Sequence, residues 1–361
     1  KVYNIKNLNE IPQKKRKTRK IRNLIAYIIF TSGSTGIPKG VSISYKSLNK
    51  YLFWLNLKFK DKKIKKISQY SDLSFDLSVM EIFGAFASGS TLCPIQNKFY
   101  KTYPLEFIKK YNIDCWISVP SIVDLMMLDS KNFKYISSLK NIFFCGEPLL
   151  KKHLDFLYLK NAKINVFNTY GPTEFTVSCS EIKLNKSNYK NKILNSVSVG
   201  KPINGTKFLI KGNFNKGELL ISGDQLFSDY LNMRQEYNNK IIKIKNRKYY
   251  KSGDIFLKKG DHYYFINRND RQIKRKGYRI ELEEIDNLIR LKKVEFVYSF
   301  QNKKGEIITL IKNKKKIDLN KIIKNKLPNY FLPDTIRYID RVDYNQNNKV
   351  DYKKLEKSNS F

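Results

Sequence analysis

The sequence is poor in the residues that metal, redox and disulfide chemistry require. Its 361 residues include four cysteines and two histidines, and no two cysteines have the C-x-x-C spacing. The sequence therefore gives no support to a zinc site or a thioredoxin-type redox site, and it suits a reduced, cytoplasmic setting. No G-x-S-x-G motif accompanies His153 or His262, so a Ser-His-Asp triad has little support either.

Long apolar runs are also absent. No stretch reaches the roughly 18 uncharged apolar residues that a membrane-spanning helix requires, so membrane insertion is not expected. The N-terminal stretch KVYNIKNLNE has neither a hydrophobic signal core nor an initiator methionine. We therefore expect the sequence to be truncated at its N-terminus. Apolar residues nevertheless make up 41% of the chain, enough for a sizeable core in more than one domain.

Acidic residues are scarce relative to basic ones. The chain has 70 lysines and arginines against 32 acidic residues, a net charge of +38, and a basic patch KKRKTRK at 14–20. Such a charge is typical of proteins that bind nucleic acid or an anionic surface. The lysines are spread over the whole chain, however, which favours an AT-rich genome as the cause. We therefore expect no nucleic-acid partner.

Short apolar runs alternate with segments of helical spacing through about residue 230. Strands are predicted at LIAYIIF (24–30), DCWISV (114–119), NIFFC (141–145) and INVFNTY (164–170). Helices are predicted at 45–56 and 81–89. Shorter strands follow from about residue 205, and two helices and two strands are expected after residue 270. This order predicts α/β layers followed by a small α+β unit.

The most informative loop is TSGSTGIPKG at 31–40, which lies between two apolar runs. It is not a Walker A motif, because that motif places lysine directly after its second glycine, whereas Lys39 follows Pro38 here. Backbone amides freed by its three glycines can still approach phosphate oxygens closely, and its hydroxyls and lysine add donors. The loop favours phosphate binding, with an ordinary flexible turn as the alternative.

Four later stretches add polar residues in loops. NTYGPTE (168–174) follows an apolar strand, and its glutamate suits a Mg²⁺ ion held against nucleotide phosphates. YYKSGD (249–254) ends in Asp254, whose carboxylate can accept hydrogen bonds from both hydroxyls of a ribose. NRNDRQIKRKGYRIE (267–281) and NQNNKVD (345–351) contribute an arginine and a lysine in polar turns.

In this order, these stretches resemble the motifs of the adenylate-forming superfamily of acyl- and aminoacyl-activating enzymes. The resemblance covers residues 25–356 and includes GELLISGDQLFSDYLN and LPNYFLP. Members of this family use ATP to convert a carboxylate into an acyl-adenylate and then pass the acyl group to a thiol. The resemblance implies ATP and Mg²⁺ as cofactors. It also implies a large layered α/β domain at 1–269, incomplete at its N-terminus, and a small mobile α+β lid at 270–361 with its hinge at Asp270.

The motif match also implies roles for single residues. Lys349 would bridge the substrate carboxylate and the α-phosphate, Glu174 would bind Mg²⁺, and Gly277 would line the channel for the carrier's thiol arm. The residues expected to bind the nucleotide are Thr31, Ser32, Gly33, Ser34, Thr35, Gly36, Lys39, Asn168, Thr169, Tyr170, Gly171, Thr173, Asp254 and Arg268. Because lysines are abundant, only the NNKVD context distinguishes Lys349 from a surface lysine.

The stretch SFDLSVMEIFG (74–84) bears on the substrate. Asp76 stands where amino-acid-activating members hold the α-amino group, although an aspartate here would equally suit a helix N-cap. Within the superfamily, the sequence is most similar to ligases that load D-alanine onto a carrier protein. That likeness places Leu77, Met80, Ser118, Phe143, Cys145 and Val177 around a small side-chain pocket. Cys145 would lie near the alanine methyl, or it is a small buried residue that ends a strand.

We therefore expect an ATP-dependent ligase that activates a small amino acid, D-alanine foremost, and transfers it to the phosphopantetheine thiol of a separate carrier protein. One alternative is adenylation of another amino acid in a peptide-synthetase-like or glycan-modifying pathway, because one methyl group gives only about 1–3 kcal/mol of discrimination. Alternatives of another class are a non-enzymatic basic nucleic-acid-binding protein and an inactive fragment.

Overall fold

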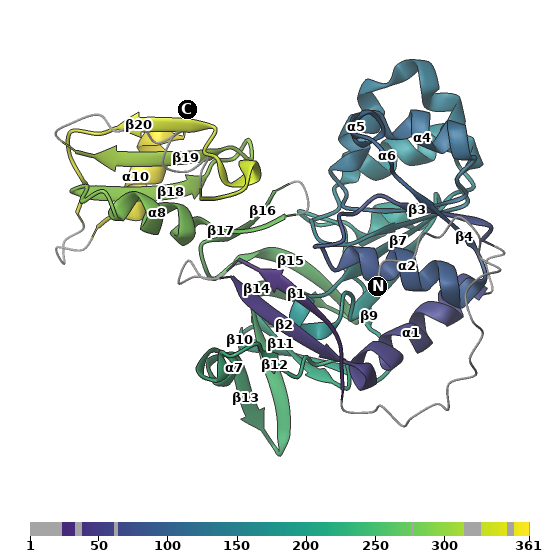
Figure 1. Ribbon diagram of the computed structural model, residues 1–361, viewed down its shortest axis with the longest axis horizontal. Coiled ribbons are helices and arrows are strands. Elements are labelled where there is room, and N and C mark those ends of the chain that lie inside the picture. The colour runs from purple at the N-terminus through teal and green to yellow at the C-terminus, as the bar shows by residue number, and fades with distance from the viewer. Residues whose placement is uncertain are drawn as a thin grey trace, which may run out of the picture.

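A mixed seven-stranded sheet lies at the centre of the larger part of the molecule (Figure 1). The computed structural model describes residues 24–32, 38–60, 64–275, 278–313, 326–344 and 350–360. In spatial order the strands of this sheet are β4 (Thr91–Pro94), β3 (Lys66–Gln69), β5 (Cys115–Ser118), β6 (Asn141–Phe144), β7 (Asn165–Tyr170), β8 (Ser180–Leu184) and β9 (Lys201–Pro202). The first five are parallel, whereas β8 and β9 each run antiparallel to the preceding strand.

Helices cover both faces of this sheet because successive strand residues point to opposite sides. One layer consists of α1 (Tyr45–Lys60) and α2 (Leu77–Ser88). The other contains α3 (Lys98–Thr102), α4 (Pro104–Tyr111), α5 (Ile122–Leu128) and α6 (Lys151–Lys160), with a 3₁₀ helix at Ser130–Ser138. In β6, Phe143 packs with the α1–α2 layer, while Ile142 and Phe144 pack in the core beneath α4, α5 and α6.

Two further sheets pack beside this layered unit. One consists of β1 (Ile25–Thr31), β2 (Lys39–Ser44) and β12 (Asp229–Tyr230), and α7 (Arg234–Lys240) follows it in the chain. The other consists of β10 (Thr206–Asn213), β11 (Lys216–Gly223), β13 (Ile241–Ile244), β14 (Arg247–Lys259) and β15 (His262–Arg268). Single 3₁₀ turns occur at Thr173–Phe175 and Tyr189–Lys192.

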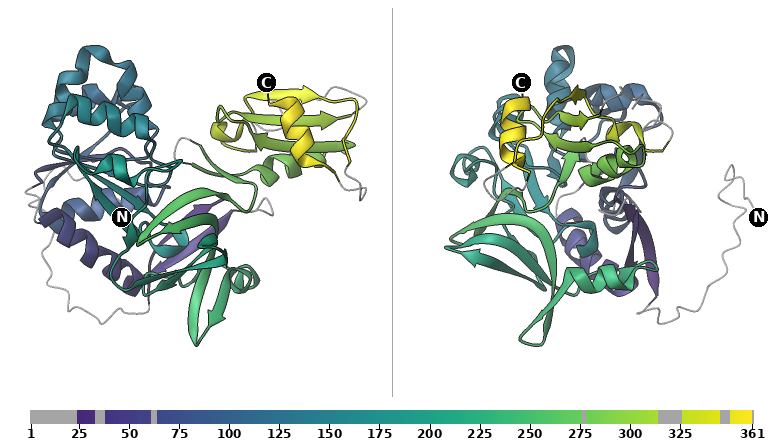
Figure 2. Two further views of the ribbon diagram at one scale, coloured as in Figure 1. Left: turned by 180° about the vertical axis from the view of Figure 1, so that it is seen from behind. Right: turned by 90° about the vertical axis from the view of Figure 1, so that its left-hand side faces the viewer.

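The C-terminal residues form a separate small α+β unit. A hairpin of β16 (Gln272–Arg275) and β17 (Tyr278–Glu281) leads to a sheet of β18 (Phe296–Gln301), β19 (Ile307–Lys312) and β20 (Thr335–Tyr338). Figure 2 shows α8 (Leu282–Arg290) and α10 (Tyr352–Asn359) on opposite faces of this sheet. A 3₁₀ turn at Asn329–Phe331 packs with the α8 side.

The order in which parallel strands are added to the sheet reverses at β3, and this creates a topological switch point. Strand β4 lies on one side of β3, and the next parallel strand, β5, lies on the other side. In parallel α/β sheets, ligands bind beyond the carboxyl ends of the strands at such a topological switch point. Residues 70–76 after β3 and residues 119–121 after β5 border this crevice.

Most of the predicted elements are confirmed. The four apolar runs correspond to β1, β5, β6 and β7, and the two helical segments to α1 and α2. The layered α/β architecture with an α+β unit after residue 270 is confirmed as well. The predicted last helix at 318–327 lies largely outside the described residues. Within the described ranges, no helix is long and apolar enough to cross a membrane.

Glu81 on α2 fixes the start of the loop that follows β3. Its buried carboxylate accepts hydrogen bonds from the backbone N–H groups of Tyr70 (2.9 Å) and Ser71 (3.0 Å) and from the Ser71 hydroxyl (3.2 Å). Burial raises the pKa of Glu81 to about 8, even though these hydrogen bonds favour the ionised form and act to lower it. The folded chain therefore keeps a proton on Glu81 at pH values where the unfolded chain has released it.

We predict that this proton makes stability fall as pH rises. Between the ordinary value of 4.5 and about 8, the folded state binds more protons at Glu81 than the unfolded state. The free energy of unfolding should therefore decrease by up to about 1.4 kcal/mol per pH unit. Glu81→Gln keeps an oxygen acceptor but cannot titrate, so it should remove this slope in urea denaturation measured across that range. The exposed Glu295→Gln is the matched control, and a pH-independent difference between Glu81→Gln and the parent would contradict the assignment.

Candidate active site

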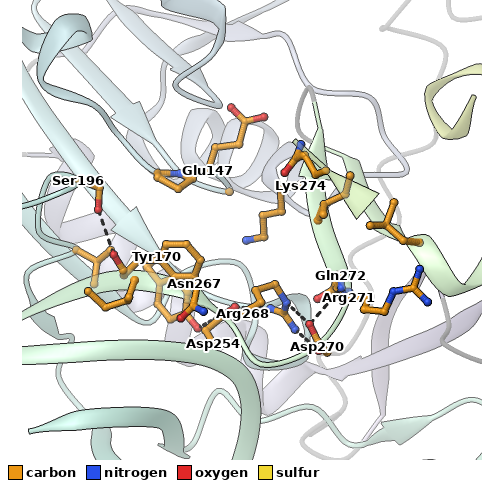
Figure 3. A pocket seen from close by; sticks show the side chains of 18 of the residues that line it. Glu147, Tyr170, Ser196, Asp254, Asn267, Arg268, Asp270, Arg271, Gln272 and Lys274 are labelled. Atoms are coloured by element: carbon orange, nitrogen blue, oxygen red, sulfur yellow. Dashed lines mark hydrogen bonds and ion pairs between the residues drawn. The ribbon is translucent and has the colours of Figure 1, made fainter. Parts of the chain in front are cut away.

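A cavity of about 560 Å³ opens at the carboxyl edge of the seven-stranded sheet (Figure 3). One wall consists of residues that end or follow β6 and β7, including Glu147 and Tyr170. The other wall comes from β14, β15 and β16, with Asp254, Arg268 and Lys274. Folding therefore brings the NTYGPTE, YYKSGD and NRNDRQIK stretches to a single site.

An ion pair and a phenol form the most tightly connected group in this cavity. Asp254 and Arg268 are direct partners in the β14–β15 ladder, and the arginine donates to the buried carboxylate. The Tyr170 hydroxyl donates to the other oxygen of Asp254 at 2.6 Å. Burial raises the pKa of Tyr170 far above its usual value, and the negative charge of Asp254 raises it further. The phenol therefore stays protonated and serves as a hydrogen-bond donor.

Arg268 also binds the next acidic residue along the chain. Its Nε and Nη2 atoms donate to the two carboxylate oxygens of Asp270 at 2.6 and 2.7 Å. Gly253 leaves the room for this arrangement, since its φ is +74° and an added Cβ would lie 2.8 Å from Arg268 Nη2 and from Asp270 Oδ2. Any other residue at position 253 would displace the guanidinium, the Asp270 carboxylate, or both.

Arg271, only three residues after Arg268, binds a different part of the molecule. Its guanidinium donates to Glu283 and Asp286 on α8, both at 2.7 Å, and to the carbonyl oxygen of Ser299 on β18. Arg268 is thus held by β14, whereas Arg271 is held by the C-terminal unit. Residues 269 and 270 therefore lie between an arginine bound to the larger part and an arginine bound to the C-terminal unit.

A smaller compartment of about 40 Å³ adjoins the main cavity and shares Asp254, Arg268 and Lys274 with it. Asp76, Leu77 and Cys145 line this compartment. Asp76 stands at the N-cap position of α2, but its side chain makes no capping hydrogen bond. The geometry therefore gives no support to the capping alternative.

The Cys145 thiol lies between the compartment and the core. It donates to the Val177 carbonyl oxygen at 3.6 Å and accepts from the Ser178 hydroxyl at the same distance. Burial raises the pKa of Cys145, although hydrogen bonds with Thr169 and Ser178 act to lower it. Cys145 is thus a neutral, small side chain at the wall of the compartment.

Four residues expected around the side-chain pocket lie in the core instead of on the cavity wall. Met80, Ser118, Phe143 and Val177 are almost fully buried, and in the described part of the chain none of them lines either cavity. Phe143 is stacked on its cross-strand partner Phe167, with the ring centroids 4.4 Å apart. These side chains support the compartment from behind and do not face its interior.

Glu174 and Lys39 are both engaged by neighbouring side chains. The Tyr230 hydroxyl donates to Glu174 Oε1 at 2.7 Å, and Lys39 Nζ lies 5.7 Å from the centre of the same tyrosine ring. Lys39 forms a 2.6 Å ion pair with Glu236 on α7. Within the described residues, no group of three or more acidic, histidine or cysteine side chains could hold a metal ion.

The remaining predicted residues fall into three groups. Asn168 and Thr169 line the main cavity, and Gly171 and Thr173 line the small one. Gly171 has no room for a side chain, because an added Cβ would lie 2.5 Å from the Val177 carbonyl oxygen. Thr31 and Ser32 border a third cavity between the larger part and the C-terminal unit. The predicted residues Gly33, Ser34, Thr35, Gly36, Gly277 and Lys349 lie outside the described residues.

Several cavity residues were not predicted from the sequence. Lys274 and Gln272 lie two residues apart on β16 and both line the main cavity, as do Glu147 and Asn267. The two-residue spacing in QIK could have suggested a shared strand face. Because QIKRKG contains several basic residues in a row, the sequence did not show which of them lines a cavity.

A nucleotide-binding enzyme of the α/β class is the kind of protein that this fold and site define, because the polar residues cluster in a cavity beyond the carboxyl ends of the parallel strands β6 and β7. Residues 3–231 match the family model described as AMP-binding enzyme, and the chain belongs to this family. The resemblance noted from the motifs is thereby confirmed.

Relatives in bacteria are named D-alanine–D-alanyl carrier protein ligase. The relative from Listeria monocytogenes serotype 4a (strain HCC23) is 32% identical, over 97% of this chain and 73% of its own length. The relative from Staphylococcus epidermidis (strain RP62A) is 32% identical, over 92% of this chain and 71% of its own length.

Solved structures agree on the fold. The Vibrio cholerae adenylation domain AlmE, in complex with glycyl-adenosine-5'-phosphate, is similar with a TM-score of 0.83 and 28% identity, over 94% of this chain and 67% of that one. An NRPS protein containing adenylation and PCP domains is similar with a TM-score of 0.80 and 20% identity, over 99% of this chain and 64% of that one. The second likeness concerns the fold alone.

We predict that breaking the Asp254–Arg268 pair by removing one partner costs far more stability than breaking an exposed pair does. Arg268→Ala would leave a buried carboxylate without its cation, and this should reduce the free energy of unfolding by about 3 kcal/mol or more. Arg234→Ala is the matched control, because Arg234 pairs with Asp229 at the surface and its loss should cost less than about 1 kcal/mol. Urea denaturation of both variants tests this, and equal losses would contradict it.

Proposed function

We propose that the protein activates a small amino acid, D-alanine foremost, with ATP and transfers it from the aminoacyl-AMP to the phosphopantetheine thiol of a separate carrier protein. The observation that carries this proposal is the pair of adjoining cavities. The main one holds Tyr170, Asp254 and Arg268, and the small one holds Asp76 and Cys145. A nucleotide and an amino acid would thus lie next to each other, as bond formation between them requires.

The main cavity suits the nucleotide. Its volume of about 560 Å³ lies within the usual range for small-molecule sites. Asp254 already accepts from Tyr170 and Arg268, and a carboxylate has further lone pairs for the two ribose hydroxyls. Arg268 fixes this carboxylate in direction, and Tyr170 offers an aromatic surface near the adenine.

The small compartment suits the amino acid. Asp76 is only 6% exposed, and an ammonium group bound there would pair with its carboxylate. The ion pair between that ammonium and a buried carboxylate would favour amino acids over acids that lack an amino group. The limited volume and the Cys145 wall favour a side chain no larger than a methyl group.

The phosphates and a magnesium ion would lie towards Glu174 and Lys39. Mg²⁺ is commonly held by one or two carboxylates together with substrate phosphates, so the single carboxylate of Glu174 fits that role. Bound there, the ion would neutralise phosphate charge. Lys39 would exchange its partner Glu236 for a phosphate oxygen, with the loop at 33–37 supplying backbone amides.

The two steps would use different lysines from the C-terminal unit. We place the domain boundary between residues 269 and 270, since Arg268 is held by β14 and Arg271 by α8. In the arrangement described here, Lys274 reaches into the main cavity (Figure 3). By its motif, Lys349 would enter for the first step, when the amino acid's carboxylate attacks the α-phosphorus and pyrophosphate leaves. Rotation at Asp270 would exchange the two lysines.

D-alanine is the substrate named for the bacterial relatives, and a carrier protein is their named acceptor. Glycine is the second candidate, because AlmE holds glycyl-adenosine-5'-phosphate and a compartment of this size also accepts glycine. The net charge of +38 would attract an acidic carrier electrostatically. The cytoplasmic setting and the absence of a nucleic-acid partner stay predictions.

We predict amino-acid-dependent ATP–pyrophosphate exchange with D-alanine above L-alanine, glycine and D-serine. Lys349→Ala should lower the exchange rate by at least about 100-fold, because a fixed cation at the developing charge contributes several kcal/mol. Asp76→Asn should raise the KM for D-alanine by about 100-fold through loss of the ammonium's partner. The control variant Lys353→Ala, which changes an exposed lysine, should keep the parent's ATP–pyrophosphate exchange rate.

The outcomes separate the hypotheses. A preference for glycine would retain the adenylation chemistry and reject D-alanine. Folded protein that shows no exchange with any of the four amino acids would reject the proposed function.

A further inference from the structure

The loop that carries Asp76 also contacts the C-terminal unit. Residues 70–76 leave β3 at the switch point, and Glu81 holds the backbone at Tyr70 and Ser71. A turn within the loop is closed by the Phe75 N–H donating to the Asp72 carbonyl oxygen at 2.9 Å. The Asp72 side chain lies about half exposed on the outer side of this turn.

Asp72 accepts from two parts of the molecule at once. Lys101 on α3 donates to Oδ1 at 3.0 Å, and the Tyr278 hydroxyl on β17 donates to Oδ2. Burial acts to raise the pKa of Asp72, but the hydrogen bonds from Tyr278 and Lys101 outweigh it, so the pKa lies below its usual value. A charged acceptor strengthens both hydrogen bonds.

Lys101 is itself fixed by the larger part. Its ammonium lies 4.7 Å from the centre of the Tyr70 ring and donates to the Tyr70 carbonyl oxygen, while the Tyr70 hydroxyl donates to the Lys101 carbonyl oxygen at 2.7 Å. The acceptor for Tyr278 is therefore set in position by contacts within the larger part alone.

Tyr278 is equally fixed within the C-terminal unit. Its ring is stacked on Tyr330, with centroids 3.9 Å apart and planes only 5° apart. Tyr278 is the ladder partner of Arg275, which directly follows Lys274 on β16. Because the hairpin is short, the position of Tyr278 determines the position of the Lys274 side chain in the main cavity.

We propose that the Asp72–Tyr278 hydrogen bond is a latch that holds the C-terminal unit in the orientation with Lys274 in the active site, which makes both residues positioning residues for the thiol-transfer step. This inference rests on the proposed function. The latch must open before Lys349 can take the place of Lys274. It therefore stabilises one of two orientations and takes no part in bond formation.

The test measures the two steps separately in the full chain. Adenylate formation is followed as D-alanine-dependent ATP–pyrophosphate exchange, and transfer as D-alanyl thioester formed on pantetheine, a thiol probe detected by mass spectrometry. Tyr278→Phe and Asp72→Asn should each slow transfer by about tenfold or more, because a hydrogen bond to a charged group changes an equilibrium by that factor. Exchange should stay within about twofold of the parent or increase, since the opposite orientation becomes more populated.

Two comparisons make the result specific. The double variant Asp72→Asn/Tyr278→Phe should be no slower in transfer than the slower single variant, because Asp72→Asn replaces the charged acceptor of the bond by a neutral one and Tyr278→Phe removes the donor of the same bond. Asp261→Asn changes an exposed aspartate that pairs with Lys201 and is not part of the latch, and both steps should be unchanged. Additive losses, equal losses in both steps, or unchanged transfer in both single variants would each overturn the latch.

A second readout is independent of activity. Ala87→Cys and Lys303→Cys place exposed thiols on the larger part and the C-terminal unit, and the four native cysteines are buried. With dyes on the two sites, Tyr278→Phe should broaden or shift the distribution of energy-transfer efficiency relative to the parent. An unchanged distribution would reject the latch even if the parent shows no exchange, so the two proposals can fail separately.

Discussion

The ion pair between Asp254 and Arg268 is the interaction on which the site depends. Burying two charges costs desolvation energy, so such a pair is weak evidence for stability and stronger evidence that a defined geometry matters. The pair joins β14 to β15, orients Tyr170 through the second carboxylate oxygen and, through the remaining nitrogens of the guanidinium, holds Asp270. The Arg268 side chain thus connects the main cavity to the point where the two parts of the chain meet.

The orientation of the C-terminal unit is determined by contacts at both ends of a short connection. Arg271 is tied to α8, and Tyr278 reaches back to Asp72 in the loop that also carries Asp76. The proposed amine site and the proposed latch are therefore four residues apart on one loop. Binding of an amino acid and the orientation of the C-terminal unit would be linked energetically through that loop.

The sequence predicted the layers and part of the candidate site because both depend on local patterns. Short apolar runs identified β5, β6 and β7, and the motifs identified Tyr170, Asp254 and Arg268 as candidate site residues. Pairs far apart in sequence could not be predicted in this way, since no local pattern links Lys39 to Glu236 or Asp72 to Tyr278. The expected pocket residues Met80 and Phe143 lie in the core because strand and helix faces alternate, and a motif does not specify which face borders a cavity.

Gly253 has a consequence for how this enzyme can diversify. A single added carbon at Gly253 would require a strained positive φ and would displace Arg268 or Asp270, so this part of the site tolerates substitution poorly. The small compartment is also bounded by Leu77 and Cys145, which come from the α2 and β6 side of the site. If the proposed function holds, new substrate preferences can evolve on the α2 and β6 side of the site, while the side that contains Gly253, Arg268 and Asp270 stays fixed.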